Sequence, residues 1–163
     1  MKLHLTARIK KTAAEDWRKK YDEVEDFRNG LAAVKLDDKM GYVDETGNEV
    51  IPLKYDYVGD FYEIIGADGG FAKVKLDGKV GLIDYDGTEW IKPKYDYLGD
   101  FHGGLAAVKL NGKWGFINLR DKVVIPLKYD EYDDVENFSE GFARVRLNGK
   151  WISIDQQGNE VDE

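Results

Sequence analysis

The sequence predicts an all-β fold made of four tandem copies of one unit, and three observations support this. The tripeptide Lys-Tyr-Asp occurs four times, beginning at residues 20, 54, 94 and 128. Each copy is followed by a run of the form Gly-apolar-Ala-x-Val-basic-Leu. Each run then meets a turn pair, which is Asp-Gly, Asn-Gly or, in the first copy, Asp-Asp. Such pairs between runs rich in valine, alanine and aromatic residues are the strongest short-range signal for a β-hairpin.

A leader of 19 residues precedes the repeats. Residues 12–15 match a helix capping box, and Ala14, Trp17 and Tyr21 share one helical face. In an alternative alignment, with Trp17 placed at the position of Ile51, the leader resembles a degenerate copy of the second half of a repeat. We expect a strand followed by a short N-terminal helix.

A β-hairpin forms the first part of each predicted unit. The type I′ turn needs positive φ at both central residues, which Asp-Gly and Asn-Gly tolerate, and Asp38 can also adopt that region. A two-residue loop in the third copy pairs Val108 with Gly115 and Lys109 with Trp114. The predicted hairpin strands are residues 31–36, 39–43, 71–76, 79–84, 105–110, 113–118, 142–147 and 150–155.

A short third strand is expected in the first three units, at residues 49–51, 90–91 and 123–125. Each runs into a proline, which cannot donate to a β-ladder, so this strand should lie at a sheet edge or end there. Three strands per unit are fewer than the four of a propeller blade. The sequence therefore favours tandem β-hairpin or meander repeats stacked as an open twisted, solenoid-like array. The alternative is a closed four-bladed, propeller-like ring.

The length of 163 residues is that of one domain. A chain of about 150 residues can bury roughly 68–70 % of its unfolded surface, so it needs no disulfide or metal to stabilise its core. We expect a single repeat domain over residues 1–163, with a leader or cap at residues 1–19. The expected repeats are residues 20–53, 54–93, 94–127 and 128–163.

The repeated motifs resemble those of bacterial WG-repeat (KWG-repeat) proteins over residues 20–163. The best copy combines Lys113-Trp114-Gly115 with Val124-Ile125-Pro126-Leu127-Lys128-Tyr129-Asp130. Met40 and Val80 replace the tryptophan in two copies, and Ile152 replaces the glycine in the last. The resemblance implies an all-β array with varied binding roles and brings no catalytic residues.

Composition excludes several classes of protein. Asp and Glu number 32 against 24 Lys and Arg, a net charge of −8, which is the wrong sign for binding nucleic acid or anionic membranes. A protein partner with a basic or neutral surface is favoured instead. The absence of cysteine excludes disulfides, thiolate metal sites and a cysteine nucleophile. With no signal peptide and no long apolar stretch, we expect a cytoplasmic protein.

Enzymatic chemistry is not indicated. The histidines are His4 and His102 and the serines Ser139 and Ser153, and none stands in a recognisable catalytic motif. We interpret His102 as a solvated loop residue. The acidic stretch at residues 130–136 lacks the alternating spacing of a calcium loop. We expect no catalytic residues, no metal and no cofactor.

Comparison of the copies identifies candidate partner-binding residues. Tyr57 and Tyr97 occupy a position that holds glutamate in the outer copies, so this position is predicted to be exposed. Insertions relative to the repeat are the second source of candidates, since function is often placed in loops that depart from a repeat. The insertion at residues 61–70 is expected to form a mobile hairpin tip that carries Ile64 and Ile65. The candidates in these insertions are Ile64, Ile65, Tyr132, Asp133 and Asp134.

The leading functional interpretation is a non-enzymatic protein-binding module that presents variable loops on a rigid β-repeat scaffold. An adaptor or toxin-neutralising role fits this interpretation. The alternative is carbohydrate or cell-wall binding, because short hairpin repeats with aromatic residues and Asn/Asp-Gly turns also resemble cell-wall-binding repeats.

Overall fold

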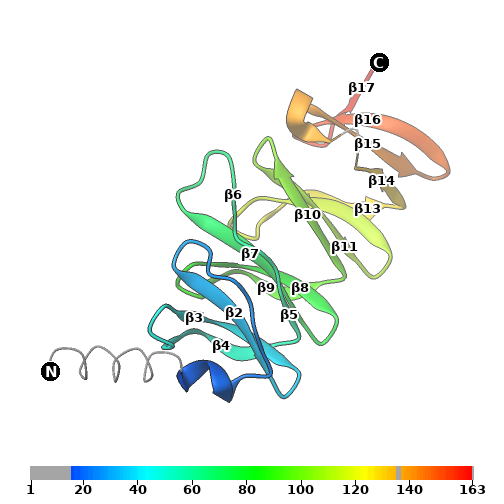
Figure 1. Cartoon of the computed structure of the whole chain (residues 1–163). Helices are drawn as coiled ribbons and strands as arrows, with labels where there is room; N and C mark the ends of the chain where they lie inside the picture. Colours follow the sequence, from blue (N-terminus) through cyan, green and yellow to red (C-terminus); the bar gives the residue numbers. More distant parts are fainter. Residues whose placement is uncertain (1–15, 135–136, 163) are drawn as a thin grey trace, which may run out of the picture. The chain divides into compact units, whose positions relative to one another are not determined.

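A computed structural model of the chain describes residues 16–134 and 137–162, and it confirms the all-β prediction (Figure 1). Two 3₁₀ turns occur among these residues, η1 (Trp17–Lys20) and η2 (Phe138–Glu140). The expected leader strand and capping box at residues 1–15 lie outside the described residues. The sheets are antiparallel, and none of those described closes into a barrel.

Contacts divide the chain into two compact units, Met1–Gly59 and Asp60–Glu163, and a single domain over residues 1–163 stays a prediction. In the first unit one four-stranded sheet follows chain order. Its core holds Tyr21, Val34 and Val43, with Trp17 packed against them. The strands of this unit are β1 (Glu23–Val24), β2 (Leu31–Leu36), β3 (Lys39–Asp44), β4 (Glu49–Tyr55) and the short β5 (Tyr57–Val58).

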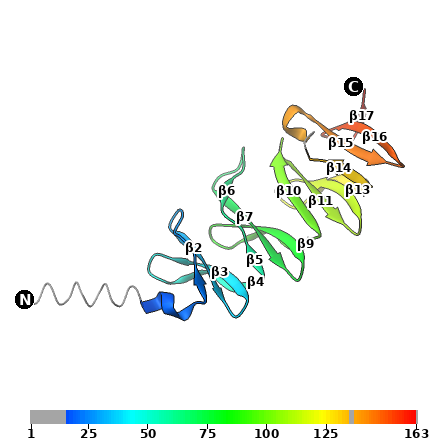
Figure 2. The same ribbon diagram turned by 45° about the vertical axis from the view of Figure 1, so that its right-hand side comes forward.

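The second unit contains three sheets that follow one another in an open row (Figures 1 and 2). The first contains β6 (Tyr62–Glu63), β7 (Gly70–Leu76), β8 (Lys79–Asp84) and β9 (Glu89–Tyr95). The second contains β10 (Tyr97–His102), β11 (Leu105–Leu110), β12 (Lys113–Ile117) and β13 (Val123–Tyr129). The third contains β14 (Glu131–Asp133), β15 (Phe142–Leu147), β16 (Lys150–Asp155) and β17 (Glu160–Val161).

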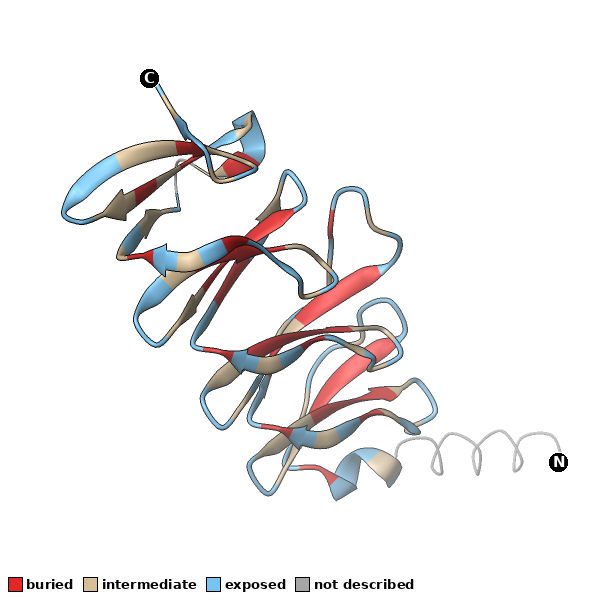
Figure 3. Cartoon of the chain, turned by 180° about the vertical axis from the view of Figure 1, so that it is seen from behind, coloured by how far each residue is buried: buried red, intermediate tan, exposed pale blue. Residues whose placement is uncertain are grey.

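Apolar side chains fill the space between successive sheets of the second unit. Leu82 and Ile91 pack with Val108 and Ile117 between the first two sheets. A second cluster, which includes Phe116, joins the second and third sheets. Buried residues accordingly concentrate in the strands, while hairpin tips are exposed (Figure 3).

The hairpin register is confirmed. Val108 pairs with Gly115, and Lys109 pairs with Trp114. Both turn residues of each hairpin have positive φ, including Asp38 at 63° in the copy that lacks the glycine. Type I′ geometry therefore sets which side chains share a face of each sheet.

The expectation of three strands per unit was wrong. The strand that meets the proline continues to the tyrosine of Lys-Tyr-Asp, as in β13, which is the edge strand of its sheet. The first strand of each sheet was also missed. In the second unit, β10 begins at Tyr97 and β14 at Glu131, directly after Asp96 and Asp130. Each Lys-Tyr-Asp there spans the junction between two sheets.

The three residues of Lys-Tyr-Asp have separate structural roles in the second unit. Tyr129 is buried, and the ammonium of Lys128 lies 5.4 Å from its ring centroid. One carboxylate oxygen of Asp130 accepts from the Lys113 ammonium of the preceding sheet. The other accepts the backbone N–H of Asn148 in the next sheet, at 3.3 Å. Asp96 repeats this arrangement with Lys79 and Asn111, so the aspartate fastens consecutive sheets.

We expect Asp130→Asn to destabilise the protein near neutral pH and to have little effect in acid. The hydrogen bond from Lys113 is the largest cause that holds the pKa of Asp130 below its ordinary value. The stabilisation that the Asp130 carboxylate provides is therefore complete above the pKa of about 3.9 that it has in the unfolded chain. It is lost as the pH falls through the lower pKa of the folded protein. Melting temperatures of the wild type and the variant, measured from neutral to acidic pH, test this effect.

Asp68→Asn is the matched control, because it removes the same charge from an exposed loop residue. Its effect on the melting temperature should be small at every pH. If the melting temperature of Asp130→Asn stays as far below that of the wild type in acid as at neutral pH, the Asp130 carboxylate does not link the two sheets as described.

Candidate functional site

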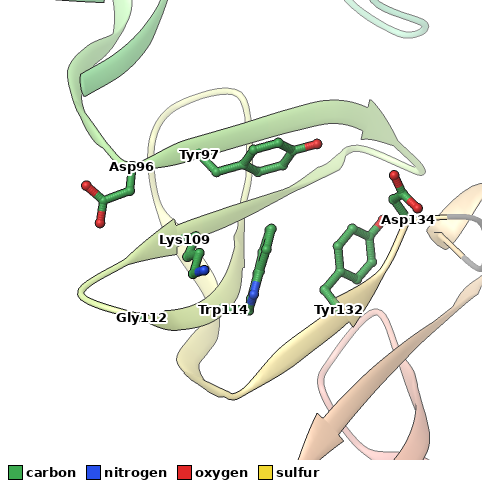
Figure 4. A pocket seen from close by; sticks show the side chains of 7 residues that line it. All are labelled: Asp96, Tyr97, Lys109, Gly112, Trp114, Tyr132 and Asp134. Atoms are coloured by element: carbon green, nitrogen blue, oxygen red, sulfur yellow. The ribbon is translucent and has the colours of Figure 1, made fainter. Parts of the chain in front are cut away.

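An open groove in the second unit combines aromatic and charged side chains (Figure 4). Its volume is about 650 Å³. We call it the aromatic groove, and it is lined by Asp96, Tyr97, Lys109, Gly112, Trp114, Tyr132 and Asp134.

Three strands supply the rings. Tyr97 is the first residue of β10 and pairs with Lys109, which in turn pairs with Trp114 on β12. Tyr132 comes from β14 in the next sheet, where it pairs with Val145. The ring centroids of Tyr97 and Trp114 are 5.1 Å apart, and those of Trp114 and Tyr132 are 5.7 Å apart. Contacts of this length are favourable aromatic pairs, so each ring restrains its neighbour.

The charges of the groove are distributed unequally. At one end Asp96 is paired with Lys79, and the Lys109 ammonium lies 5.6 Å from the Trp114 ring centroid. At the other end Figure 4 shows the hydroxyl ends of Tyr97 and Tyr132 on the side where Asp134 lies. Burial and then the Asp134 charge raise the pKa of Tyr132 to about 12, and the same two causes raise the pKa of Tyr97. Both phenols are therefore neutral at physiological pH.

The groove arises where the chain departs from its own repeat. Tyr97 stands where Glu23 and Glu131 stand in other copies. Tyr132 stands where other copies have Val24, Val58 or Leu98, and the last two of these are buried. A tyrosine at a core position keeps its ring packed against Trp114 and places its hydroxyl at the groove.

The structure brings together three predicted site residues, Tyr97, Tyr132 and Asp134, in this groove. Tyr97 is 42 % exposed, which confirms its predicted exposure. Asp133 ends β14 beside the groove. Tyr57, in the first unit, is also exposed as predicted, at 51 %. A patch shared by Tyr57 and Tyr97 stays a prediction.

Two interpretations of single residues were wrong. Ile64 is buried in the core beside Phe71, so it anchors the insertion rather than forming an exposed tip, whereas Ile65 is fully exposed. His102 is not a loop residue, because it is the last residue of β10 and pairs with Leu105.

Sequence reasoning missed Trp114, Lys109 and Asp96 as parts of this site. In the sequence, Trp114 stands out only as the tryptophan of the repeat pattern. The hairpin register, which places Lys109 beside Trp114, was the available signal. The second link, from Lys109 to Tyr97, depends on β10, a strand that the sequence did not reveal.

The described residues offer no group of three or more histidine, aspartate or glutamate side chains that could hold a metal ion. In the same part of the chain, no helix has the length and apolar character needed to cross a membrane.

A comparison with protein families finds the model described as WG containing repeat at four places, residues 19–39, 40–79, 81–114 and 114–151. No curated protein matches the chain significantly. The matches together cover more than half of the chain.

Proposed function

From the premise that this chain belongs to the WG-repeat family, we propose that it is a non-enzymatic protein-binding module whose aromatic groove contacts a partner protein. Stacked β repeats supply a rigid scaffold on which individual positions can vary without loss of the fold. In the groove, Tyr97 and Tyr132 stand at such variable positions. Its partner has a basic or neutral surface at the contact, because the chain carries a net charge of −8.

The observation that carries this proposal is the convergence of Tyr97, Trp114 and Tyr132 from three strands around an open volume of about 650 Å³. Tyrosine and tryptophan dominate the energetic centres of protein interfaces. They offer large contact areas at a low cost in conformational entropy. Here neighbouring rings already restrain each side chain, so little further ordering is needed on binding.

The groove also favours a second candidate function, carbohydrate binding. Aromatic rings can stack on sugar rings, and the Asp96 and Asp134 carboxylates at the groove can accept hydrogen bonds from sugar hydroxyls. The two functions differ in their ligands but use the same residues. The ligand class therefore has to be tested directly.

Selection of a displayed random peptide library on the wild-type chain, with Tyr97→Glu as the counter-selection target, tests the proposal. The variant carries the residue that the chain itself has at positions 23 and 131, so its fold should be retained. We expect peptides that bind the wild type and not the variant. A glycan array that yields a ligand lost in Tyr97→Glu, with no peptide enriched, would instead support carbohydrate binding.

A further inference from the structure

We propose that a small cavity beside the aromatic groove, which shares Tyr97, Tyr132 and Asp134 with it, binds an arginine side chain of the partner protein. This inference rests on the proposed function and names the group that the site recognises. The cavity has a volume of about 120 Å³ and is lined by Tyr97, Gly99, Asp100, His102, Tyr132 and Asp134. This volume is several times the roughly 10–15 Å³ that one water needs, so a small polar group can enter.

A carboxylate without a cationic partner lines this cavity. Asp100 is already paired with Lys73, at 2.8 Å between Nζ and Oδ1. The Asp134 side chain makes no ion pair or hydrogen bond with any residue in the described ranges 16–134 and 137–162, and only its backbone carbonyl accepts from Asn137. One negative charge at the cavity is therefore uncompensated by these residues, and a cation of the partner complements it.

The rings beside Asp134 favour a guanidinium over other cations. Tyr97 and Tyr132 both line the cavity, with their hydroxyl ends near Asp134 (Figure 4). A guanidinium is planar and weakly hydrated, so it can stack on an aromatic face while it donates to a carboxylate. An ammonium is a strongly hydrated point charge that cannot match both surfaces equally.

The part of the aromatic groove at Asp96, Lys109 and Trp114 already shows the same chemistry within the chain. There the Lys109 ammonium lies over the Trp114 ring, and Lys79 neutralises Asp96. A partner's cation is therefore repelled from that part and directed to Asp134. The polarity of the groove sets the direction in which a peptide lies.

Nuclear magnetic resonance titration with Nα-acetyl-arginine amide tests the proposal, with Nα-acetyl-citrulline amide as a neutral probe of nearly the same shape. We expect the arginine probe to shift the signals of Tyr97, Trp114 and Tyr132 saturably. The citrulline probe should not. Asp134→Asn should weaken the arginine response at least about fivefold, as expected for the loss of a charged hydrogen-bond partner. The charge-matched control Asp68→Asn should leave the response unchanged.

Equal responses to the arginine and citrulline probes would overturn the proposal. So would an arginine response that Asp68→Asn weakens as much as Asp134→Asn does. Either result would mean that the probe contacts the protein without a charge-selective site. Saturation of the same signals by N-acetylglucosamine with no arginine response would also overturn it. Selected peptides that bind the groove without arginine would refute this inference and leave the proposed function standing. An arginine response without any peptide or protein ligand would support this inference and count against the proposed function.

Discussion

Replacing Gly115 by alanine is expected to destabilise the second unit almost as strongly as replacing it by valine. A Cβ at this position would lie 2.7 Å from both the carbonyl oxygen of Ile125 and the backbone nitrogen of Leu127. The clash is with backbone, so no side-chain rotation relieves it. Overpacking of this kind costs about 3 kcal/mol at the upper end of its usual range. The irregular register of β13 against Trp114 and Phe116 brings that backbone close.

Chemical denaturation of both variants measures this effect, with Gly99→Ala as the matched control. At Gly99 the nearest atom to a new Cβ would be 3.4 Å away, the carbonyl oxygen of Ala107. This control should be neutral or slightly stabilising, by about 0.4–1 kcal/mol. If alanine is tolerated at position 115 while valine is not, the clash would come from a larger side chain facing Val108 rather than from the close approach of β13.

The last repeat explains why this glycine can be lost. Ile152 occupies the position of Gly115. In that sheet β17 has only two residues, which pair with Ser153 and Ile154. No proline-containing strand crosses at Ile152 in the described residues, so a side chain has room there.

Tyr97→Ala is expected to reduce the affinity for a groove ligand by 2 kcal/mol or more, about 30-fold, as the loss of a central interface aromatic does. Tyr97 is 42 % exposed and contacts Trp114 at the surface. The free energy of unfolding should therefore change by less than about 1 kcal/mol. Calorimetric titration with a selected peptide and denaturation of the same variant measure the two quantities.

Tyr57→Ala, alone and combined with Tyr97→Ala, determines whether the first unit also contributes. An added loss in the double variant would extend the contact surface to Tyr57. Full affinity in the double variant would place the binding surface elsewhere, and exposed Ile65 would be the next residue to test.

The hairpins could be predicted from sequence because local chemistry determines them. Asn111 and Gly112 specify a two-residue turn, and that turn determines every pair from Leu110 with Lys113 to Ala106 with Ile117. The proline strands were predicted too short, because Pro126 lies in an edge strand whose other residues continue to pair. Proline marks the edge of these sheets and not the end of the strand.

The first strand of each sheet and the groove could not be predicted in this way. β10 has a register shift between Leu98 and Phe101, which removes the simple alternation by which a strand is recognised. Tyr97, Trp114 and Tyr132 are brought together by pairing within one sheet and by packing of the next. The sequence identified Tyr97 through its predicted exposure and Tyr132 through its insertion, as separate candidates. Only the stacking of the sheets joins them into one site.

Photo-crosslinking from position 97 tests the central claim, that the partner binds in the aromatic groove, most directly. p-Benzoylphenylalanine in place of Tyr97 should form a covalent adduct with a selected peptide or captured partner. The same group in place of Phe142, which is 53 % exposed on the last sheet, should form none. Adducts from position 142 and not from position 97 would contradict the account.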